Sequence, residues 1–182
     1  MIVEPTRLPE VCLIRPKVFG DERGWFMESW HAQRYSEQGI GPQFVQANQS
    51  HSARGVLRGL HYQWPEPQGK LVWVTQGRVL DVAVDIRQSS PTFAQWVAVE
   101  LDSDSHTQLW VPEGFAHGFV VLSETATFSY LCTRPYRAEF DRGIAWNDPD
   151  LAIDWPSIQP ELSAKDQGAM RLSEISADLL PP

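Results

Sequence analysis

Short segments in which apolar and polar residues alternate constrain the fold of this chain more than any other feature. Gly and Pro residues separate many of these segments, and no long stretch with helical spacing lies between them. The segments span residues 43–50, 55–63, 70–76, 78–87, 93–101, 107–112, 117–123 and 127–133. A period of two, with many Val, Leu and aromatic residues, is typical of β-strands. Successive strands without intervening helices predict an all-β sandwich or barrel and exclude a βαβ fold.

Two shorter patches have helical character. Residues 31–39 end on a glycine, in the manner of a helix C-cap. Ser163 is a suitable N-cap for a helical turn that holds Asp166 in its first turn. With 182 residues, 42% of them hydrophobic, the chain suits a single domain over residues 1–182. We expect the tail, residues 156–182, to pack on the barrel.

Charge and cysteine content narrow the class of protein. The formal net charge of −8 argues against nucleic-acid binding through a broad basic surface. The N-terminus lacks the pattern of a signal peptide, and no apolar run approaches the roughly 20 residues of a membrane span. Cys12 and Cys132 are too few for a disulfide framework, which predicts buried free thiols. We therefore expect a cytoplasmic protein that binds neither nucleic acid nor membrane.

Two motifs resemble those of the cupins, a class of jelly-roll barrels that bind metal through His and Glu. The matching residues are His61, Gln63 and Lys70 in the first motif, and Pro112, Gly114 and His117 in the second. Gln63 replaces a histidine ligand and Lys70 replaces the carboxylate. An ammonium has no lone pair to offer a cation, and two imidazoles with one amide make a poor metal site. The motifs predict a double-stranded, cupin-like jelly roll with a few short helices and without a metal.

The same residues suit proton transfer next to a carbonyl group. Histidine has an ordinary pKa near 6.5, so His61 is a candidate base, and Lys70 is a candidate stabiliser of a developing oxyanion. Tyr130 is a candidate acid, and Asp166 a candidate hydrogen-bond partner for the imidazole. Taken alone, His61 also fits a hydrogen-bonded core histidine, and Tyr130 fits an ordinary core or rim residue.

The chain resembles the dTDP-4-dehydrorhamnose 3,5-epimerases from about Arg15 to about Asp166. The resemblance rests on the order and spacing of the blocks DERGWFMES, GVLRGLHYQ, QGKLV, DVAVDIRQSSPTF, QLWVPEGFAHGFVVLSE, GIAWNDP and LSAKD. It implies a jelly-roll barrel, a dTDP-sugar substrate and catalysis without metal or cofactor. It also implies a homodimer in which strands are exchanged, with the N-terminal segment contributing to the dimer.

The resemblance also assigns roles to residues. It implies His61 as the base, Asp166 as its partner, Tyr130 as the acid and Lys70 as the residue that stabilises the enolate. The positions it implies for binding the substrate are Arg23, Phe26, Glu28, Gln46, Asn48, Arg58, His117, Tyr136 and Lys165. Two positions depart from the pattern of many members: Leu131 stands in place of a lysine, and Trp73 in place of an arginine.

The implied reaction converts dTDP-4-dehydro-6-deoxy-D-glucose into dTDP-4-dehydro-L-rhamnose, for lipopolysaccharide or cell-wall polysaccharide synthesis. One alternative is an epimerase that acts on only C3 or only C5 of a related nucleotide ketosugar. A second is a metal-dependent cupin, against which Gln63 and Lys70 argue. A third is a jelly roll that binds a sugar nucleotide without catalysis.

Overall fold

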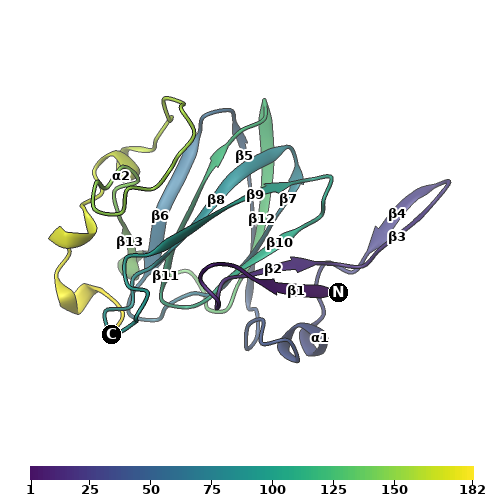
Figure 1. Cartoon of the computed structure of the whole chain (residues 1–182), viewed down its shortest axis with the longest axis horizontal. Coiled ribbons are helices and arrows are strands. Elements are labelled where there is room, and N and C mark those ends of the chain that lie inside the picture. The colour runs from purple at the N-terminus through teal and green to yellow at the C-terminus, as the bar shows by residue number, and fades with distance from the viewer.

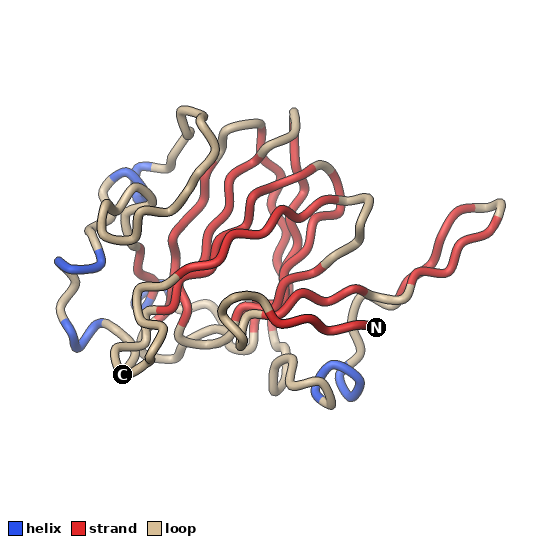
Figure 2. Tube along the Cα trace, in the orientation of Figure 1, coloured by secondary structure: helices blue, strands red, loops and turns tan.

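Two antiparallel sheets face each other in the computed structural model, which describes residues 1–182 (Figure 1, Figure 2). The six-stranded sheet has the order β1-β2-β10-β7-β12-β5, and the five-stranded sheet has the order β13-β6-β11-β8-β9. The first sheet comprises β1 (Ile2–Pro5), β2 (Cys12–Arg15), β10 (Gln108–Val111), β7 (Lys70–Gln76), β12 (Thr125–Cys132) and β5 (Gln46–Ala53). The second comprises β13 (Asp141–Gly143), β6 (Leu57–Gln63), β11 (Phe115–Val121), β8 (Arg78–Asp85) and β9 (Trp96–Asp102).

Apolar side chains from both sheets fill one end of the space between them. Val72, Leu109, Phe119 and Phe128 are members of this buried core, and the rings of Phe119 and Phe128 stack with centroids 4.1 Å apart. Because successive strand residues point to opposite faces, the period of two in the sequence delivers one apolar row from each strand to this interior. The arrangement confirms the predicted jelly-roll barrel, and all eight predicted segments contain strands.

Each sheet is covered on its outer face. The helix α1 (Ala32–Ser36) lies over the six-stranded sheet, where Tyr35 packs with Ile14 and Trp110. The opposite outer face is covered by the end of the chain, where Leu172 and Leu180 are buried in a second apolar cluster. This end contains α2 (Ala164–Gln167) and the 3-10 helices η2 (Leu172–Glu174) and η3 (Ala177–Leu179); a further 3-10 helix, η1 (Ala138–Phe140), precedes β13.

A two-stranded hairpin, β3 (Val18–Asp21) and β4 (Gly24–Met27), projects from the body of the molecule at the right of Figure 1. The ring of Trp25 lies 4.2 Å from that of His106, between β9 and β10, but the apolar residues Phe19, Trp25 and Phe26 are still 53%, 59% and 69% exposed. A monomer rarely leaves such a cluster of aromatic side chains in water without a partner surface.

The sequence-based expectations differ from the structure in several details. The strands β1 to β4 and β13 were not predicted, because each has only three or four residues and, of all of these, only Ile14 is buried; β10 has four residues too, but all of them are buried. The helix α1 ends at Ser36 with Glu37 as its C-cap, so Gly39 is not the cap; it lies in the following turn with a φ of 76°. Both cysteines are free, but Cys12 is only partly buried, whereas Cys132 is buried. None of the helices has the length and apolar character needed to cross a membrane.

Candidate active site

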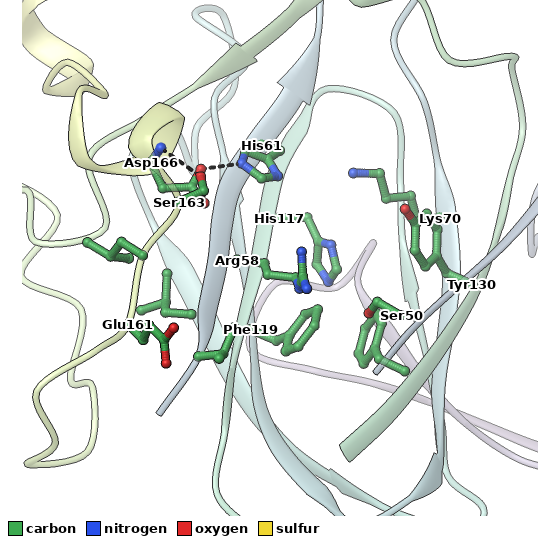
Figure 3. Close-up of a pocket in the computed structure, with 14 residues that line it drawn as sticks. Ser50, Arg58, His61, Lys70, His117, Phe119, Tyr130, Glu161, Ser163 and Asp166 are labelled. Carbon is green, nitrogen blue, oxygen red and sulfur yellow. Dashed lines mark hydrogen bonds and ion pairs between the residues drawn. The ribbon is translucent and has the colours of Figure 1, made fainter. Parts of the chain in front are cut away.

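Two adjoining cavities lie between the sheets and share His61, Lys70 and Tyr130. The first has a volume of about 480 Å³ and is also lined by Arg58, His117, Phe119, Phe128, Ser163 and Asp166, among others. The second has a volume of about 340 Å³ and is also lined by Gln46, Asn48, Tyr136, Asp141 and Lys165, among others. Most of the predicted site residues, which are far apart in the sequence, therefore line these two cavities, the first of which is shown in Figure 3.

His61 and Asp166 form a hydrogen-bonded pair at one wall of the first cavity. His61 lies on β6, and its Nε2 is 2.5 Å from Oδ1 of Asp166 on α2. Asp166 is buried, and its Oδ2 accepts a hydrogen bond of 2.8 Å from the Ser163 hydroxyl. Burial opposes ionisation of Asp166, but the bonds from His61 and Ser163 and the charge of Lys165 outweigh it and lower its pKa. With Nε2 held by a carboxylate, the other imidazole nitrogen, Nδ1, is free to exchange a proton in the cavity.

Lys70 and Tyr130 extend into the cavity from the opposite sheet. They come from the paired strands β7 and β12, and in Figure 3 no hydrogen bond or ion pair joins either of them to another lining residue. Burial lowers the pKa of the Lys70 ammonium and raises the pKa of the Tyr130 phenol. An unpaired ammonium and a protonated phenol can therefore face the imidazole of His61 across a space without competing partners.

His117 lies beside His61 on the neighbouring strand β11, in direct register. Its Nε2 is 2.9 Å and 3.0 Å from the two carboxylate oxygens of Asp81 on β8, and both residues are buried. Sequence reasoning missed Asp81. Its signal was a carboxylate in the middle of an otherwise apolar strand, because a fully buried Asp nearly always has a hydrogen-bonding partner.

Four of the predicted binding residues line the second cavity. The side chains of Gln46 and Asn48 are hydrogen-bonded to each other at 3.0 Å. Asp141, another residue that sequence reasoning missed, accepts hydrogen bonds from the Tyr136 hydroxyl at 2.9 Å and from the Lys165 ammonium at 2.5 Å. The cavity is thus lined by amides, a phenol and a paired ammonium, which can bind the polar edges of a base or sugar.

Arg58 belongs to the first cavity. Its Nε donates a 3.1 Å hydrogen bond to the hydroxyl of Ser52. No carboxylate forms an ion pair with this guanidinium, so its outer nitrogens remain available to a ligand.

Arg23, Phe26 and Glu28 do not reach either cavity of their own chain. Arg23 and Phe26 lie on the projecting hairpin, where Arg23 pairs with Asp21 at 2.6 Å. Glu28 follows the hairpin and forms an ion pair with Arg34 of α1.

The two positions that depart from the family pattern also lie outside the cavities. Trp73 and Leu131 point to the outer face of the six-stranded sheet, because they alternate with residues that point inward.

Gln63 has its amide engaged with the backbone: it donates to the carbonyl of Glu66 at 2.6 Å and accepts from the amide of Arg137 at 2.8 Å. No group of three or more His, Cys, Asp or Glu side chains is arranged to hold a metal ion.

Comparisons with known proteins agree on one family. A family model described as dTDP-4-dehydrorhamnose 3,5-epimerase matches residues 5–174. The chain is 52% identical over 183 residues to the dTDP-4-dehydrorhamnose 3,5-epimerase of Pseudomonas aeruginosa, covering 98% of this chain and 100% of that one. It is 40% identical to a dTDP-4-dehydrorhamnose 3-epimerase of Streptomyces niveus, covering 100% of this chain and 89% of that one.

A solved structure gives the same result. The chain superposes with a TM-score of 0.96 on a dTDP-6-deoxy-D-glucose-3,5-epimerase from Legionella pneumophila, crystallised in complex with dTDP-4-keto-L-rhamnose. The two proteins are 54% identical, and the match covers 99% of this chain and 97% of the other.

Proposed function

This chain belongs to the dTDP-4-dehydrorhamnose 3,5-epimerase family, and from that membership we propose how its own residues carry out the reaction. The enzyme epimerises dTDP-4-dehydro-6-deoxy-D-glucose at C3 and C5 to give dTDP-4-dehydro-L-rhamnose. Identity of 52% to a 3,5-epimerase, against 40% to a 3-epimerase, supports action at both carbons.

The observation that carries the mechanism is the His61–Asp166 pair, which faces Lys70 and Tyr130 across the first cavity. The C4 ketone acidifies the protons on C3 and C5. His61, oriented by Asp166, removes one of these protons, and the electrons of the C–H bond move onto the carbonyl oxygen to form an enolate. Lys70 stabilises the negative oxygen, and Tyr130 donates a proton to the opposite face of the carbon. Protons move and no electrons are lost, so the step requires no redox cofactor.

The second cavity is where we place the nucleotide. Gln46, Asn48, Tyr136 and Lys165 line it, and it joins the first cavity at His61, Lys70 and Tyr130. Arg58 and His117 line the first cavity. There we assign Arg58 to the diphosphate or the sugar, and His117 to the sugar.

We further propose a homodimer in which the β3–β4 hairpin of one protomer reaches the cavity of the other. The exposed aromatic residues of the hairpin support this, as does the position of Arg23, Phe26 and Glu28 outside the cavities of their own chain. The cytoplasmic location expected from the sequence stays a prediction.

The test is turnover in D₂O, with NADPH and a coupled reductase to trap the product. We expect the trapped sugar to carry deuterium at both C3 and C5 and to have the L-configuration. Deuterium at one carbon would identify a single-site epimerase, and no exchange would contradict the proposed function. His61→Ala should lose exchange at both carbons by about 10²- to 10⁴-fold, the usual contribution of a general base. If this variant exchanged at the wild-type rate, His61 would not be the base.

A further inference from the structure

The Asp166 carboxylate is held at both of its oxygens, and only one of them is used by His61. We propose that Ser163 is a positioning residue for the His61–Asp166 pair: its hydroxyl fixes the carboxylate in the orientation that His61 requires. This inference rests on the proposed function, because it assigns a role within the same proton-transfer site.

Ser163 and Asp166 make two reciprocal hydrogen bonds. The Ser163 hydroxyl donates to Oδ2 of Asp166 at 2.8 Å and accepts from the backbone N–H of Asp166 at 3.1 Å. Oδ1 of the same carboxylate is 2.5 Å from Nε2 of His61, as the dashed lines in Figure 3 indicate. The carboxylate cannot rotate without breaking one of these bonds, so the direction of its bond to the imidazole is fixed.

Capping of the helix alone does not account for this arrangement. An N-cap hydroxyl needs only to accept from a backbone N–H of the first turn. Here it also donates to a side chain, and α2 is a helix of only four residues. At the starts of η1 and η3 no side chain caps the helix, so this fold does not require such a bond at every short helix. The second bond of Ser163 acts on the carboxylate.

The charged groups around Asp166 make the loss of the Ser163 hydroxyl measurable as a change in pH dependence. Asp166 faces His61 from β6 and Lys165 on its own helix, while Lys70 from β7 and Glu161 from the preceding loop line the same space. Burial opposes ionisation of Asp166, and Ser163 is one of the groups that together lower its pKa. Removing the hydroxyl therefore raises the pKa of Asp166. Because Asp166 must be ionised to orient the base, the acidic limb of the pH profile of kcat/KM should move to higher pH.

Three substitutions separate the hydroxyl from the cap. Ser163→Ala removes the hydroxyl and puts a poor capping residue at the start of the helix. Ser163→Gly also removes the hydroxyl, but glycine at an N-cap lowers helix stability only slightly. Ser163→Thr keeps both the hydroxyl and the capping. We expect kcat to fall about 10- to 100-fold in the Ala and Gly variants, the effect of one lost hydrogen bond to a charged group. Both variants should show the shifted acidic limb, and Ser163→Thr should resemble the wild type. Affinity for dTDP, measured by calorimetry, should stay unchanged, because Ser163 does not line the second cavity.

Ser176→Ala is the matched control. Ser176 also hydrogen-bonds an aspartate, Asp178, near the start of a short helix, but it lies outside both cavities. A wild-type kcat and pH profile in Ser163→Gly would overturn the proposal, even if Ser163→Ala were impaired, and so would equal losses in Ser176→Ala. If Ser163→Ala fails to fold, the Gly and Thr variants decide. Failure of the wild-type protein to turn over the ketosugar would instead contradict the proposed function itself.

Discussion

Replacing Lys70 by methionine should make the enzyme more stable and almost inactive. The Lys70 ammonium lies among the residues that line both cavities, and burial lowers its pKa. No carboxylate forms an ion pair with it. The Lys70 charge therefore lowers the stability of the folded protein. We expect only the enolate oxygen of the substrate to compensate for this loss.

The expected changes in kcat and in stability follow from these contacts. Loss of one group that stabilises an oxyanion typically lowers kcat about 10²- to 10³-fold, or roughly 3–4 kcal/mol. Replacing a poorly compensated, partly buried charge by an apolar side chain of similar size should raise the free energy of unfolding by about 1 kcal/mol. In a protein of this size that raises Tm by about 2–4 °C.

The pH dependence has a definite sign. A lysine whose pKa is lowered in the folded state destabilises the fold at any pH below that folded pKa, where it binds a proton in both states. The cost declines as the pH rises through the folded pKa and is gone above the ordinary lysine value of 10.5. The stability gained by Lys70→Met should therefore be largest at pH values below the folded pKa and shrink to nothing as the pH approaches 10.5.

Thermal unfolding and NMR-detected exchange in D₂O measure the two effects. Lys17→Met is the control, because Lys17 is exposed and lines neither cavity. It should change stability by less than about 0.5 kcal/mol. A Lys70→Met variant with kcat within 5-fold of the wild type would refute the oxyanion role. A variant destabilised by more than about 1 kcal/mol would refute the argument that the ammonium is held at a cost.

Two further predictions concern the acid and the dimer. Tyr130→Phe should keep proton abstraction, seen as deuterium exchange into the substrate, while losing most inversion; unchanged inversion would remove Tyr130 from the mechanism. Phe26→Ala should raise KM, although Phe26 lies outside the cavities of its own chain, and mixing it with His61→Ala chains should restore one intact site per mixed dimer. Mass spectrometry would show whether mixed dimers form. If they form and activity does not recover, the hairpin is not exchanged between protomers.

The alternation of apolar residues was sufficient to predict the barrel strands, because burial of one face per strand imposes that period. The short strands β1 to β4 gave too few residues for a period to be recognised, and the projecting hairpin buries little in its own chain. The order of strands within each sheet depends on pairings between residues distant in the sequence. No local pattern in one sequence specifies those pairings.

The candidate site was predictable where a motif marked it. His61, Lys70 and His117 occur in motifs with fixed spacing, and the structure brings them together with Tyr130 and Asp166 around one cavity. Asp81 and Asp141 were missed, because their importance depends on which side chains the fold brings next to them.

The His61–Asp166 pair joins a strand from the first half of the barrel to a turn that follows every barrel strand in the chain. During synthesis on a ribosome, the strands can assemble before the segment with Asp166 has emerged. The strand walls of the cavities can therefore form before the carboxylate that orients the base is in place. Asp166→Asn in the full chain mimics that incomplete state: it should retain dTDP binding, because Asp166 does not line the second cavity, while its base lacks an orienting carboxylate.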